Sequence, residues 1–173
     1  MHSANRNLGW AGLAAASLLF AAGGAQAQLD PRAPIDITAD SSEVIQSLCQ
    51  STWNGAVEAL QGRTRLRAES VRMYSTRRGD TCGASDRMEA EGQVYFVTPE
   101  RTVRADSAVY SFGGETITLS GNVIVVQGKS VVRGDRLVIN TRNGQAQMSS
   151  NIRGRNKAGR VRGVFYPDQG TAN

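Results

Sequence analysis

The stretch GNVIVVQGKSVVRGD at residues 121–135 indicates the fold of the chain. Its first apolar run is β-branched and has the period of a β-strand, with Val123 and Val125 on one face and Ile124 and Val126 on the other. Gln127-Gly128-Lys129 has the composition of a tight turn, and a second apolar run follows it. The stretch therefore predicts two antiparallel strands that start at a glycine and lead to an acidic residue.

The same unit recurs along the chain. A short motif that reads apolar, usually Arg, small, acidic ends at Asp40, Glu69, Asp106 and Asp135, in steps of 29, 37 and 29 residues. The glycines that open the units precede three of these acids by 14 residues each. A fifth, degenerate copy at 161–164 has valine in place of the acid. Such a repeat predicts stacked units, here about nine long antiparallel strands between Pro34 and Tyr166.

Each acidic residue conflicts with the alternation of the strand that carries it. If Ala105 faces the interior, a straight strand would turn Ala108 and Tyr110 outward. Unpaired carboxylates would not line an apolar core. A bulge or corner beside each acid removes the conflict, so these residues are interpreted as corner residues rather than as a catalytic carboxylate pair.

Two cysteines, Cys49 and Cys82, are expected to form a disulfide in an oxidising compartment. The long step of the repeat places an eight-residue polar insertion between Ser75 and Arg87. Both cysteines are expected in equivalent loops of adjacent units, which would stack at one end of the sheet. Two buried free thiols are the alternative.

Residues 1–27 have the order of a signal peptide, with Arg6, an apolar run over 8–24 and the cleavage motif Ala25-Gln26-Ala27. We expect cleavage, export to the periplasm and a single domain over 28–173; an uncleaved membrane anchor is the alternative. His2 is the one histidine and would leave with the leader. The mature chain would then lack the histidine of a Ser-His-Asp triad or of a His-based metal site. We expect no enzyme, no catalytic or metal-binding residue and no cofactor.

An open stack of strand pairs would enclose an apolar channel and leave two free edges. Residues 28–60 carry a net charge of −4 and residues 136–173 a net charge of +6. Ends of opposite sign favour head-to-tail association. The basic residues of 153–162 are not interleaved with aromatic residues, so we expect no nucleic-acid partner.

The order of these motifs resembles that of the LptA/OstA family of periplasmic lipopolysaccharide-transport proteins. The resemblance covers about residues 34–167 and rests on the A-x-A leader, the opening PIDITAD at 34–40, the glycine-to-acid units and the closing GRVRGVFYP at 159–167. It implies an open antiparallel β-jellyroll that holds lipopolysaccharide acyl chains without catalysis. It also implies a head-to-tail bridge from an LptC-like inner-membrane protein to an LptD-like outer-membrane protein. The cysteine pair and the insertion depart from the family pattern.

Strand periodicity assigns the side chains that face the interior. Those expected to contact lipid are Val57, Val71, Met73, Val94, Phe96, Ala108, Tyr110, Val123, Val125, Leu137 and Ile139. Ordinary core packing is the alternative for this set. The residues expected at the partner edges are Ile35, Ile37, Val161, Val164 and Phe165. Two other functions stay open: a self-assembling periplasmic β-solenoid scaffold without lipid cargo, and an LptC-like membrane-anchored component.

Overall fold

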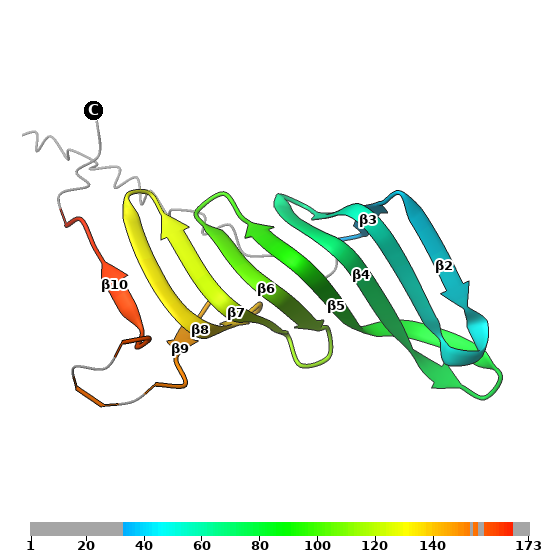
Figure 1. Ribbon diagram of the computed structural model, residues 1–173. Helices are drawn as coiled ribbons and strands as arrows, with labels where there is room; N and C mark the ends of the chain where they lie inside the picture. Colours follow the sequence, from blue (N-terminus) through cyan, green and yellow to red (C-terminus); the bar gives the residue numbers. More distant parts are fainter. Residues whose placement is uncertain (1–32, 153, 156–157, 168–173) are drawn as a thin grey trace, which may run out of the picture.

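The computed structural model describes residues 33–152, 154–155 and 158–167, so the expected signal peptide lies outside the described residues. The chain forms one antiparallel sheet in the order β1-β3-β4-β5-β6-β7-β8-β10, with β2 also paired to β3 and β9 to β8 (Figure 1). The strands are β1 (Ile35–Thr38), β2 (Ser41–Ile45), β3 (Gln50–Gln61), β4 (Thr64–Arg78), β5 (Thr81–Val97), β6 (Thr102–Ser111), β7 (Thr116–Gln127), β8 (Ser130–Asn140), β9 (Ala146–Ser149) and β10 (Arg162–Val164). The expected all-β, open antiparallel sheet is confirmed. None of the helices in the described ranges is long and apolar enough to cross a membrane.

The described residues form ten strands rather than the expected nine or so, and because each edge is made of two short strands, these correspond to eight strand positions across the sheet. β1 and β2 pair with opposite halves of β3, on either side of Asp40. β9 and β10 likewise pair with opposite halves of β8. The interruptions at both edges occur where the inner strands of the sheet carry their bends.

The expected corner beside each acid is confirmed as a row of bulges that crosses the sheet. In each pair Gly55-Ala56, Gly92-Gln93 and Gly121-Asn122 both residues have positive φ, and the strand register shifts at all three pairs. The acid strands change parity at the same row, so that Ala105 and Ala108 are both buried while Asp106 between them is exposed. Bulges of this kind bend a strand. The sheet therefore folds over on itself along one line, and its two halves enclose the core.

Each acidic side chain lies over the bulge of the next bulge-bearing strand in the chain. A Cβ built on Gly121 would lie 2.3 Å from Oδ2 of Asp106, and one on Gly55 would lie 2.2 Å from Oδ2 of Asp40. At the last copy, the Asp135 carboxylate accepts hydrogen bonds from the backbone N–H of Asn151 and the hydroxyl of Ser150, both at 2.8 Å. These bonds lower the pKa of Asp135 below its usual range. The acids are thus corner residues.

The eight-residue insertion between Ser75 and Arg87 forms parts of two strands rather than a loop. It extends β4 and β5 into a hairpin with its turn at residues 79–80, so the expected position of Cys82 in a loop was wrong. Cys82 lies on β5 and forms a disulfide with Cys49, with 5.3 Å between their Cα atoms. Arg77 of the same hairpin donates to the backbone carbonyl of Ser47. Figure 1 shows the tip of this hairpin beside the turn that follows β2. Polar residues suit a two-stranded extension because it has little apolar core to cover.

Candidate functional site

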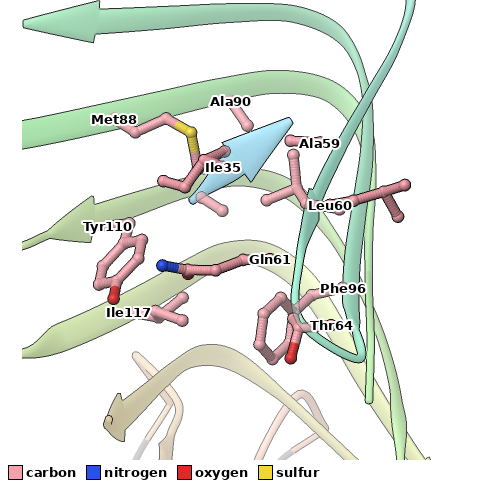
Figure 2. Close-up of a pocket in the computed structure, with 12 residues that line it drawn as sticks. Ile35, Ala59, Leu60, Gln61, Thr64, Met88, Ala90, Phe96, Tyr110 and Ile117 are labelled. Atoms are coloured by element: carbon pink, nitrogen blue, oxygen red, sulfur yellow. The ribbon is translucent and has the colours of Figure 1, made fainter. Parts of the chain in front are cut away.

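A cavity lined mostly by apolar side chains lies between the two halves of the sheet, near β1. The cavity volume is about 30 Å³, within about 440 Å³ of empty space that includes open solvent. Figure 2 shows side chains from several strands converging on this space. The lining residues are Ile35, Ala59, Leu60, Gln61, Thr64, Leu66, Met88, Ala90, Phe96, Ala108, Tyr110 and Ile117.

The lining of the cavity has little polar chemistry. Gln61 and Thr64 flank the β3–β4 turn, and the Gln61 side-chain amide donates to the carbonyl of Ala33 at 3.0 Å. The ring of Tyr110 packs against Phe112 with 4.4 Å between centroids. Burial raises the pKa of Tyr110, so its hydroxyl stays neutral at physiological pH. Tyr110 is the one ionisable residue in this lining. The space therefore suits an apolar ligand best.

Three of the eleven side chains expected to contact lipid line this cavity, namely Phe96, Ala108 and Tyr110. Six others are buried in the core that joins the two half-sheets: Val57, Val71, Val94, Val123, Leu137 and Ile139. Met73 and Val125 are only partly buried against that core. Val57, Val71, Val94 and Val123 are almost completely inaccessible. These four pack the bend rather than the cavity.

Ile35 lines the cavity although the sequence indicated only an edge role for it. β1 is the first strand in the sheet order, so Ile35 and Ile37 lie on one edge strand. At the other end β10 carries Val164, with Val161 and Phe165 directly beside it, and all three side chains are exposed. The lining of the cavity thus extends from Ile35 on the β1 edge to Ile117 on β7, and no residue of β8, β9 or β10 takes part in it.

Sequence reasoning missed much of the lining because it did not carry the alternation as far as the turn after a bend, nor back along the strand before a bend. The alternation through Ala59 and Gln61, and through Thr64 and Leu66, continues the same period on either side of a turn. Met88, Ala90 and Ile117 precede a bend. A period-two count in both directions from each bend glycine would have found the positions on β3, β5 and β7, and pairing across the β3–β4 turn would have added Thr64 and Leu66.

The described residues contain no group of three or more His, Cys, Asp or Glu side chains that could hold a metal ion. The corner acids are separated from one another by the glycine-bearing strands, since Glu69 lies on β4 and Asp106 on β6 with β5 between them. A paired-carboxylate mechanism needs two such groups side by side, and this row does not place them so.

One protein family matches most of the chain. The family described as "LptA/(LptD N-terminal domain) LPS transport protein" matches residues 36–145. The match covers β1 to β8 and every bulge of the row from Asp40 to Asp135.

Two individual proteins extend the comparison. The uncharacterized protein R00383 of Rhizobium meliloti (strain 1021) is 28% identical over 148 residues, which span 78% of this chain and 80% of that protein. The crystal structure of LptH from Pseudomonas aeruginosa, titled the LptA-homologous periplasmic component of the lipopolysaccharide transport device, has a TM-score of 0.67 and 18% identity. The superposition covers 80% of this chain and 99% of LptH. The fold is therefore the open jellyroll of that structure.

Proposed function

This chain belongs to the family of LptA and LptD N-terminal domain lipopolysaccharide transport proteins, and from that membership we propose its place in transport. It acts in the periplasm, where it binds lipopolysaccharide through the acyl chains and carries it from the inner to the outer membrane. It does so as one segment of a head-to-tail bridge between an LptC-like and an LptD-like partner. It performs no chemistry on its cargo.

The observation that carries the proposal is the apolar cavity between the half-sheets. Aliphatic and aromatic side chains of β1, β3, β4, β5, β6 and β7 meet there, and part of the space is open to solvent. Burial of acyl chains against such side chains is favourable by about 25 cal/mol for each Å² removed from water. An acyl chain that enters there lies along the fold of the sheet, and that fold continues toward β8.

The two unpaired edges support the bridge. β1 and β2 form one end of the sheet, and β9 and β10 form the other. An exposed edge accepts a strand from another protein through backbone hydrogen bonds. The edge strands carry unlike charge, since Asp36 and Glu43 lie on β1 and β2 while Arg162 lies on β10. Edge-to-edge pairing of unlike ends produces a continuous bent sheet and a continuous interior.

Site-specific photocrosslinking in cells that make lipopolysaccharide tests the proposal. A photoreactive amino acid at Phe96, which is 5% exposed and lines the cavity, is expected to give lipopolysaccharide adducts. The neighbouring Tyr95, 37% exposed on the other face of β5, is the matched control and should give none. A second pair, Ile35 and Asp36, repeats the comparison at the rim, where a bulky side chain disturbs the core less.

Adducts at Phe96 and Ile35 without adducts at Tyr95 and Asp36 would support transport through the interior. Folded, exported variants with no adduct at either inner position would favour the scaffold without lipid cargo. Detection of the uncleaved leader on the exported protein would favour the LptC-like anchored component.

A further inference from the structure

The arginine of the repeated motif has no role in the interior or in the corner. Strand register places these arginines in one row on the outer face of the sheet, because each position pairs with the next: Arg67 with Tyr95, Tyr95 with Arg104, Arg104 with Ile124, Ile124 with Arg133, and Arg133 with Arg162. All four arginines are exposed. The row runs from β4 to β10.

At the β10 end of the row, like charges lie directly opposite one another. Arg133 and Arg162 are register partners, and like charges in that relation destabilise a sheet. The two side chains line a surface hollow together with Lys129, Val131, Val164 and Tyr166. The hollow has about 650 Å³ of empty space, including space open to solvent, and no acidic residue lines it. Three cations around a hollow without a carboxylate make a binding place for an anion.

Among the described residues, Glu58 neutralises Arg67 of the row, and no ion pair joins a carboxylate to Arg104, Arg133 or Arg162. In the described part of the chain, ion pairs link Glu58 to Arg65 and Arg67, Glu89 to Arg72 and Arg87, and Glu115 to Arg142. The register neighbours of Arg104 are Tyr95 and Ile124, neither of them acidic. The positive charge at Arg104, Arg133 and Arg162 thus faces outward without a cross-strand acidic neighbour.

An apolar band accompanies the basic row. A second row lies on the same face, two residues along each strand from the basic row and closer to the turns. Its register partners are Val97, Thr102, Val126, Val131 and Val164. Val126 and Val164 are about 40% exposed and Tyr166 is about half exposed. Cations beside exposed aliphatic and aromatic side chains are typical of surfaces that lie at the headgroup level of a bilayer.

We propose that the outer face of β6, β7, β8 and β10 docks on a bilayer surface that carries anionic phospholipids. Lipid phosphates lie among Lys129, Arg133 and Arg162, where charge-assisted hydrogen bonds hold them and relieve the repulsion of the opposed arginines. Val126, Val164 and Tyr166 contact the interfacial region beside them. This surface is on the outside of the sheet, so its contact with a membrane leaves the interior free and does not depend on the cargo.

The test is cosedimentation of the full mature chain with lipid vesicles. Wild type is expected to bind vesicles that contain phosphatidylglycerol and not vesicles of phosphatidylcholine alone, with weaker binding at higher salt. The double variant Arg133→Gln/Arg162→Gln should lose about 30-fold in affinity, since each surface cation contributes about fivefold. The matched control Arg63→Gln/Arg78→Gln removes the same charge from exposed positions in the β3–β4 turn and on β4, outside this surface.

Loss in the first double variant but not in the control, with circular dichroism unchanged in both, would support the docking surface. Equal losses in both would mean that net charge alone drives binding and would overturn the proposal, as would no binding of wild type to phosphatidylglycerol vesicles. The photocrosslinking experiment decides the transport function separately, because its inner positions do not touch this face.

Discussion

Gly121 and Asp106 illustrate how the residue pairs of the repeat bend the sheet. Gly121 has a φ of +80°, and a Cβ there would collide with the Asp106 side chain, its distance to Asp106 Cβ being 2.8 Å. The residue after the glycine also has positive φ, and at position 122 an asparagine occupies it, a type that tolerates this conformation better than most. Backbone conformation and side-chain contact therefore require glycine at the same position.

Substitution of Gly121 by alanine is expected to lower the free energy of unfolding by about 2–5 kcal/mol. Positive φ costs alanine about 1–2 kcal/mol, and the collision with Asp106 adds overpacking of about 1–3 kcal/mol. Urea denaturation followed by circular dichroism measures the loss. Gly62→Ala is the control, since Gly62 has a φ of +58° but no atom within 4 Å of the added Cβ. Equal losses in the two variants would show that the contact with Asp106 is unimportant.

At the scale of elements, the β4–β5 hairpin differs most from the rest of the repeat. Its strands have 15 and 17 residues, against 12 or fewer in every other strand. The backbone N–H of Ser75 donates to the carbonyl of Cys49, and the disulfide with Cys82 fixes the same place. The extension is thereby attached to the β2–β3 connection, next to the edge proposed to meet a partner.

Removal of the disulfide by Cys49→Ser/Cys82→Ser is expected to cost about 3–4 kcal/mol, because the bond closes a span of 33 residues. Thermal unfolding of the double variant should match that of wild type under reducing conditions. A reductant that lowers the midpoint of the double variant as much as that of wild type would contradict this account, since the variant has no disulfide to lose.

At the scale of the whole molecule, the sheet is open and its two ends are unlike. The N-terminal edge is formed by β1 and β2 and carries exposed Val44, while the C-terminal edge is formed by β9 and β10 with exposed Phe165 beside it. Unlike ends that pair produce filaments rather than closed dimers. The cavity beside β1 would then meet the C-terminal end of the next copy or of a partner.

Phe165→Asp is expected to weaken head-to-tail association by at least tenfold, because it removes an exposed aromatic anchor and adds a charge at the partner edge. Phe165 is 70% exposed, so the stability of the monomer should be unchanged. Light scattering across a dilution series measures the association. Tyr95→Asp, on the face of a central strand, is the control. Equal weakening by both variants would exclude β10 as the interface.

The sequence by itself determined the strand pairs, the bend beside each acid, the two edges and the family resemblance. These features are local: the alternation of Val123 to Val126, the turn at Gly128 and the glycine-to-acid spacing are all encoded within one unit of the repeat. Hydrophobic period and turn chemistry act over a few residues, so they can be read without knowledge of the fold.

Only the tertiary structure decided which inward side chains line a cavity and which fill the core. Val94 and Phe96 have the same parity on β5, yet Val94 packs at the bend and Phe96 reaches the open space. The distance between the half-sheets at each position depends on how all the strands fold together, and no single strand encodes it. The same holds for Arg133 and Arg162, whose opposition arises from the register between β8 and β10. These two positions, 29 residues apart in sequence, become neighbours only when β10 pairs with β8 in the folded sheet.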